Sequence, residues 1–95
     1  MARYVSLLRF TPQGIQKLKQ SPTRAAAFRK AAEKEGVKIE AQFWTAGAYD
    51  GILILSADSE TKALNAVARL GALGNVSTQT LQAFDAEEFA DIAGG

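Results

Sequence analysis

The stretch WTAGAYDGILIL, Trp44 to Leu55, decides the fold of this chain. Its first part holds two glycines and an aspartate, the residue types that turns between antiparallel strands use. Its second part, ILIL, is apolar at every position, which is typical of a strand covered on both faces. The preceding segment, Val37 to Thr45, alternates apolar and polar side chains, which predicts a half-buried strand. We therefore expect an edge strand to turn back here into a central strand.

The elements around this hairpin follow from strand-forming runs, helix caps and glycine stops. In chain order they are a strand over 3–10, a short helix to 20, a helix over 22–35, a helix after 59 that ends by 74, a strand over 76–84 and a short C-terminal helix. Thr11-Pro12 and Ser21-Pro22 each place a capping side chain before proline at the first helical position. Asp85 followed by Glu88 matches a capping box, which predicts the start of the last helix.

This order is the split βαβ arrangement of an α+β, ferredoxin-like domain, here a single domain over residues 1–95. Right-handed crossovers place the first and third strands at the centre of the sheet and the second and fourth at its edges. Both main helices then cover one face of the sheet, and the other face stays open.

The open face is expected to carry large apolar side chains. This follows if Val5 and Leu7 point toward the helices, because alternate residues of a strand point to opposite faces. The side chains then expected on the open face are Tyr4, Leu8, Phe10 and Trp44. Leaving such groups in water forfeits roughly 1.5–3 kcal/mol each. We therefore expect a second copy of the chain to cover this face, giving a homodimer or higher oligomer.

Composition excludes several classes of function. Eleven basic against ten acidic residues give a net charge of +1, which disfavours nucleic acid as a partner. The chain has no cysteine and no histidine, so we expect no metal site, no cofactor and no catalytic triad built on those side chains. No stretch approaches the ~20 apolar residues of a membrane span, so we expect a cytoplasmic protein with no membrane partner.

Tyr49 and Asp50 are the candidate catalytic residues. As a phenol and a carboxylate they could serve as acid and base, although the reference pKa of tyrosine, about 10, is far from neutrality. The alternative is structural: Gly47 and Gly51 give the turn its backbone freedom, and the aspartate accepts local backbone hydrogen bonds. The residue types favour the structural interpretation.

The candidate binding residues are Trp44, Tyr49, Phe10, Leu8 and Arg24. Trp44, beside Phe10 and Leu8, is suited either to stack on a flat ligand or to anchor a protein interface. Arg24 lies near the free N–H groups at the start of a helix, which is a reasonable anion site. The alternative there is a simple helix cap by Ser21, which needs no ligand.

Five blocks in order resemble the GYD domain family of small proteins. The blocks are FTPQGI (Phe10–Ile15), SPTRAAAF (Ser21–Phe28), FWTAGAYDG (Phe43–Gly51), LGALGNVSTQTLQAF (Leu70–Phe84) and DAEEF (Asp85–Phe89). The resemblance implies a ferredoxin-like domain of the dimeric α+β barrel kind, with no established activity. The family takes its name from a Gly-Tyr-Asp tripeptide, whereas this sequence has Ala48-Tyr49-Asp50.

Two main hypotheses of function follow, beside a third possibility, a structural or regulatory partner whose exposed strand edge pairs with another chain. The first is a small homo-oligomeric module that holds a small organic ligand at the interface between sheet faces. The second is a cofactor-independent enzyme, a monooxygenase or an isomerase, with Tyr49 and Asp50 as acid and base and Arg24 or Arg9 holding an anion. The absence of histidine weighs against the second hypothesis, because the pKa of every remaining group would need a large shift to reach neutrality.

Overall fold

The structure, a computed structural model, describes residues 1–94. The elements are β1 (Ala2–Phe10), α1 (Pro12–Gln16), the 3-10 turn η1 (Leu18–Gln20), α2 (Ser21–Lys34), β2 (Val37–Trp44), β3 (Gly51–Ala57), α3 (Glu60–Ala72), β4 (Val76–Gln82) and α4 (Ala86–Gly94). The predicted elements are therefore all present. The one helix expected up to residue 20 is split, because α1 ends at Gln16 and η1 follows it.

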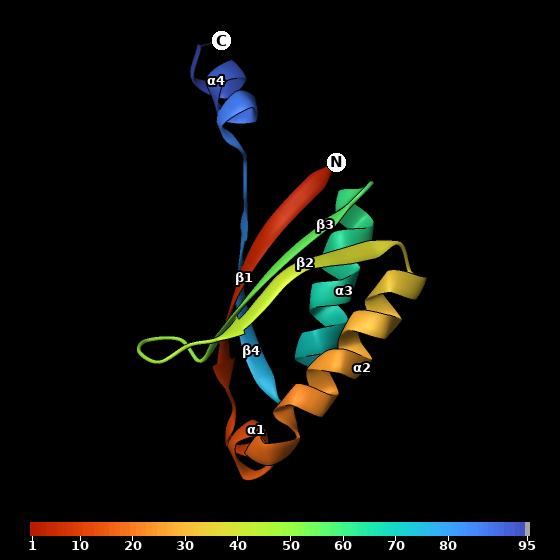
Figure 1. Cartoon of the computed structure of the whole chain (residues 1–95), viewed down its shortest axis with the longest axis vertical. Helices are drawn as coiled ribbons and strands as arrows, with labels where there is room; N and C mark the ends of the chain where they lie inside the picture. Colours follow the sequence, from red (N-terminus) through yellow and green to blue (C-terminus); the bar gives the residue numbers. More distant parts are fainter. Residues whose placement is uncertain (95) are drawn as a thin grey trace.

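The four strands form one antiparallel sheet in the order β2-β3-β1-β4. The first and third strands are central, which confirms the predicted ferredoxin-like topology. Helices α2 and α3 lie side by side on one face of this sheet, and α4 stands apart beyond the end of β4 (Figure 1). One face of the sheet is thus covered by helices and the other is open.

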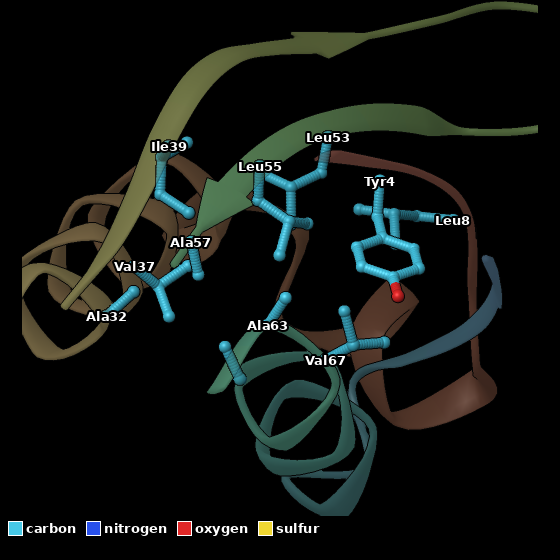
Figure 2. Close-up of a cluster of buried hydrophobic side chains, with 11 residues drawn as sticks. Tyr4, Leu8, Ala32, Val37, Ile39, Leu53, Leu55, Ala57, Ala63 and Val67 are labelled. Atoms are coloured by element: carbon cyan, nitrogen blue, oxygen red, sulfur yellow. The ribbon is translucent and has the colours of Figure 1, made fainter. Parts of the chain in front are cut away.

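The core lies between the sheet and the two helices α2 and α3, with side chains of β1 and β3 facing Ala63 and Val67 (Figure 2). Tyr4 and Leu8 belong to this core and are less than a tenth exposed. Their expected place on the open face was therefore wrong. Tyr4 pairs with Leu55, and residues that pair across antiparallel strands share a face. Both faces of β1 carry apolar residues, so its own pattern could not decide which face turns inward.

The open face of β1 instead carries Val5 and Leu7, each only partly buried. Ser6, between them, points into the core. It tolerates complete burial because its hydroxyl shares a 3.0 Å hydrogen bond with the hydroxyl of Thr80 on β4. A polar pair inside the sheet thus marks the inward face of β1.

A bulge in β2 changes which side chains face the helices. The pairing of β2 with β3 shifts between Ile39 and Ala41, so one extra residue enters the strand there. Before the bulge Ile39 is buried; after it Phe43 lies opposite Ile52 on the open face. Trp44 accordingly points to the helix side, which corrects its expected place on the open face. Regular alternation could not foresee this, because a bulge interrupts the period of two.

Helix α1 packs against the turn between α3 and β4. The Thr11 hydroxyl caps α1 by accepting from the N–H of Gly14, and it donates to the carbonyl of Gly74. Gly14 is buried against Asn75, and a Cβ added at Gly14 would lie 2.0 Å from the carbonyl oxygen of Asn75. Only glycine fits this contact.

We predict that Gly14→Ala destabilises the protein by about 1–3 kcal/mol, because the added methyl group overlaps backbone atoms that cannot easily move. Gly71→Ala is the matched control: it lies in α3, and its added Cβ would meet nothing within 4 Å. That change should stabilise the helix by up to about 1 kcal/mol. Urea unfolding checks both changes, and equal effects at the two positions would contradict the close packing at Gly14.

Candidate functional site

Most of the predicted site residues meet in one cavity on the helix-covered side of the sheet. Leu8, Phe10, Arg24, Trp44 and Asp50 all line this cavity, which has a volume of about 70 Å³. Leu8, Phe10 and Trp44 were expected on the open face and lie on the helix side instead, where Arg24 and Asp50 line the same cavity. The cavity lies at the end of the sheet where β2 turns into β3, above the first turn of α2.

Trp44 joins β2 to the start of α2. Its indole N–H donates to the hydroxyl oxygen of Ser21 over 2.9 Å, and the residue remains 49% exposed. Ser21 was expected to cap α2, but it is the first residue of the helix and its hydroxyl makes no capping bond. Its oxygen is used by the tryptophan instead. Trp44 thus presents one partly exposed aromatic face at the mouth of the cavity.

Asp50 holds the hairpin against the neighbouring strand. Its carboxylate accepts from the N–H of Phe10 over 2.9 Å, and its own N–H donates to the carbonyl of Leu8 over 2.8 Å. Its carbonyl accepts from the N–H of Thr45 over 2.9 Å. These three bonds join β1 to both ends of the hairpin. They agree with the structural interpretation of the aspartate.

Tyr49 lies in a different cavity, on the open side of the sheet. Its hydroxyl makes a 2.6 Å hydrogen bond to the side-chain carbonyl of Gln79, and the Arg9 guanidinium lies 4.6 Å from the centre of its ring. Leu7, Arg9 and Gln79 line that cavity with it, whereas Asp50 lines the cavity on the helix side. The two candidate catalytic side chains therefore do not converge on one space.

Arg24 lines the helix-side cavity but its guanidinium is engaged by backbone. It donates to the carbonyl oxygen of Lys17 over 3.0 Å, which ties the segment before η1 to the first turn of α2. A guanidinium that donates to a carbonyl in this way stabilises the junction, and no bound anion is needed. Gln79 and the acceptor role of Ser21 were missed from the sequence, because each depends on contacts between distant segments.

A groove between α2 and α3 was also missed. It has a volume of about 430 Å³ and an apolar lining that includes Ala27, Phe28, Ala31 and Ala66. At its edge, Arg69 pairs with Glu35 over 3.7 Å. The run of alanines in α2 was the available signal, because small side chains on facing helices leave room between them.

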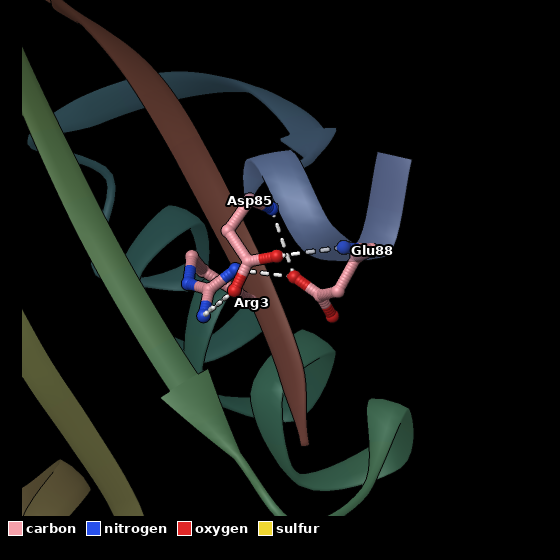
Figure 3. A network of polar contacts seen from close by, with 3 residues as sticks. All are labelled: Arg3, Asp85 and Glu88. Atoms are coloured by element: carbon pink, nitrogen blue, oxygen red, sulfur yellow. Dashed lines mark hydrogen bonds and ion pairs between the residues drawn. The ribbon is translucent and has the colours of Figure 1, made fainter. Parts of the chain in front are cut away.

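Arg3, Asp85 and Glu88 form a polar cluster that fixes the start of α4 (Figure 3). The predicted capping box is confirmed: each of Asp85 and Glu88 accepts from the backbone N–H of the other over 2.8 Å. Arg3 donates to Glu88 over 2.8 Å. The backbone N–H of Asp85 and then the Arg3 guanidinium lower the pKa of Glu88 below its usual value. The Glu88 carboxylate therefore stays ionised at acidities where a free glutamate begins to protonate.

Residues 1–94 contain no group of three or more carboxylates that could together hold a metal ion. None of the helices in this range has the length and apolar character needed to cross a bilayer.

Comparison with known protein families identifies the family of this chain. The GYD domain pattern matches residues 4–93. The chain belongs to the GYD domain family. Among curated proteins it is similar to a Thermus thermophilus protein named "Glutamine synthetase and cystathionine beta-lyase binding protein". The two are 29% identical over 84 residues, which is 87% of this chain and 88% of the relative.

Two solved structures share the fold of this GYD protein. One is a crystal structure of a protein from Thermus thermophilus, with a TM-score of 0.58 and 20% identity, covering 90% of this chain and 96% of that chain. The other is a homoserine dehydrogenase from Thiobacillus denitrificans, with a TM-score of 0.57 and 21% identity. That match covers 88% of this chain but 17% of the dehydrogenase. At these identities the likeness concerns the fold alone.

The GYD protein accommodates Ala48 in place of the family glycine without strain. Among the described residues, those with positive φ are Gly36, Gly47 and Gly74, so Ala48 has a backbone conformation open to any residue. Its carbonyl accepts from the Nε of Arg9 over 3.0 Å, a bond that any residue type could make. Gly47, with φ of 132°, supplies the freedom that the turn requires.

We predict that Asp50→Ala destabilises the GYD protein by about 1–3 kcal/mol, because the N–H of Phe10 loses its charged acceptor. Tyr49→Phe is the control, since it removes one exposed hydrogen bond and should cost less than about 1 kcal/mol. Thermal or urea unfolding of both variants checks this. Equal stability of Asp50→Ala and the unmodified protein would show that the carboxylate does not hold the hairpin.

Proposed function

We propose that this protein is a self-associating module that binds another protein, and that two copies pair through the open face of the sheet. The observation that carries the proposal is the uncovered apolar surface on that face. No catalytic role is needed to account for the side chains around the hairpin, because their polar groups already serve the fold.

The open face is apolar at its centre and polar at its ends. Its central side chains are Val5, Leu7, Ile52, Ile54, Phe43 and Leu81. Phe43 is 60% exposed, and the four residues on β1 and β3 are only partly buried. Arg3 and Arg9 lie at opposite ends of β1 on the same face. An apolar centre with a charged rim is the pattern of protein interfaces, and a two-fold pair covers both copies at once.

We predict a homodimer at micromolar concentration, measured by size-exclusion chromatography with light scattering. Leu7→Glu should weaken it by about 100-fold or more, because each copy would bury an unpaired charge at the centre of the interface. Leu64→Glu on α3 is the control, since Leu64 is exposed on the far side of the molecule and the change should leave the dimer intact. A folded monomer of the unmodified protein at these concentrations would refute the pairing.

The relative from Thermus thermophilus supports a protein as the second partner, because its name describes binding to two enzymes. In a dimer paired through the sheets, the groove between α2 and α3 stays accessible on the outside of each copy. Its apolar, alanine-rich lining and its charged edge suit an amphipathic segment of a partner enzyme. We propose this groove as the surface that contacts the enzyme.

The probe for this contact is purified glutamine synthetase from the organism that supplies this chain. Its binding is measured by biolayer interferometry. We predict saturable binding that Ala31→Glu weakens at least tenfold, because a carboxylate would enter the apolar lining of the groove. Ala26→Glu is the matched control: Ala26 is exposed on the same helix and is not among the residues that line the groove. Equal loss in both variants, or no binding by the unmodified protein, would contradict the proposal.

A small organic ligand is the second candidate, and the partly exposed ring of Trp44 at the mouth of the helix-side cavity favours it. The size and polar groups of that cavity count against it. The volume of about 70 Å³ is well below the roughly 300–1,000 Å³ of ordinary ligand pockets. Asp50 and Arg24 are already bonded to backbone, so few polar groups remain to orient a ligand. Catalysis by Tyr49 and Asp50 has still less support, because the two side chains line separate cavities.

A further inference from the structure

Helix α4 stands away from the body of the protein with its apolar side chains exposed. It buries no residue, and Phe89 and Ile92 are 57% and 55% exposed. These two side chains lie three residues apart, which places them on one side of the helix. Figure 1 shows the helix as a projection beyond the end of β4, without a second layer against it. A helix of this length is marginal in water unless its apolar side packs against something.

The anchor of α4 lies on the same face of the sheet as the proposed dimer interface. Arg3, which holds Glu88, lies opposite Ser56 and belongs to the open face by the register of β1. Leu81 lies opposite Val5 on that face and is 49% exposed. The backbone N–H of Ala83 still bonds to the carbonyl of Arg3 over 2.9 Å, so the chain stays beside β1 until α4 begins. The apolar open face thus continues along β4 toward α4.

The negative charge of this segment suits a second copy of the chain as its partner. Residues 83–94, the C-terminal arm, carry four of the ten carboxylates and none of the eleven cations. The remainder of the chain is therefore net positive. The open face itself carries Arg3, Arg9 and Lys38, so a second copy bound there offers these cations together with the apolar contacts that Phe89 and Ile92 lack.

We propose that the C-terminal arm packs against the second copy of the chain, with Phe89 and Ile92 as its contacts and the Arg3–Glu88 pair setting its direction. This inference rests on the proposed pairing through the open face. The pairing is two-fold, so each copy both gives an arm and receives one, and the two arms enlarge the interface equally.

The test compares the dimer dissociation constants of full-length variants by sedimentation. Replacing both side chains, Phe89→Ser with Ile92→Ser, should raise the dissociation constant on the order of 100-fold, because each copy loses two buried apolar groups. Leu64→Ser is the matched control, an exposed leucine on α3 that should leave the constant unchanged. Circular dichroism confirms that the sheet and main helices are intact in each variant.

Hydrogen exchange gives a second measurement that does not depend on changing the arm. Amides of α4 should exchange at least tenfold more slowly in the dimer than in the Leu7→Glu monomer, because packing holds the helix together. An unchanged dissociation constant in the Phe89→Ser, Ile92→Ser variant, or equal exchange in both states, would overturn the arm contact while leaving the sheet pairing in place. A monomeric unmodified protein would overturn both.

Discussion

The register between β1 and β3 determines the two surfaces of this protein. Pairing Tyr4 with Leu55 and Ser6 with Leu53 turns those side chains toward the helices, and it turns Val5 outward with Ile54. A shift of one residue would exchange the two faces of β1 completely. The side chains that face the helices are nearly closed to solvent. A shift would therefore expose them and place the side chains of the open face against α3. The same register therefore fixes both the core and the surface available for a partner.

The bulge in β2 determines which faces of the sheet Phe43 and Trp44 occupy. By adding one residue after Ile39 it brings Phe43 to the open face and Trp44 to the helix side. Trp44 can then reach the hydroxyl of Ser21, and the end of β2 is joined to the start of α2. Without the bulge the tryptophan would enlarge the apolar open face and the cavity beside α2 would lose one wall. The local irregularity thus divides the aromatic residues of one strand between two different roles.

Much of the architecture could be predicted from local signals, because those signals act within a few residues. The cap by Thr11, the stops at Gly36 and Gly74 and the capping box from Asp85 to Glu88 are all found where the sequence indicated them. The faces of β1 and the end of β2 could not be predicted. The face that each side chain takes there depends on which strand lies beside it and in what register. A strand that is apolar on both faces does not indicate which face turns inward. Leu8, Phe10 and Trp44 were consequently expected on the wrong face of the sheet, and the separation of Tyr49 from Asp50 was not foreseen.

The hairpin that gives the family its name serves the fold here, and this affects how function should be sought in the family. Asp50 uses its carboxylate and both backbone groups to join the hairpin to neighbouring backbone, while Tyr49 is held by Gln79 and Arg9 on the other side of the sheet. Polar groups that are already bonded have little capacity left for a substrate. Large apolar side chains remain exposed on the open face, such as Phe43 and Leu81, and on α4, such as Phe89 and Ile92. Exposed apolar surface favours association, and this supports the proposed contact with other proteins.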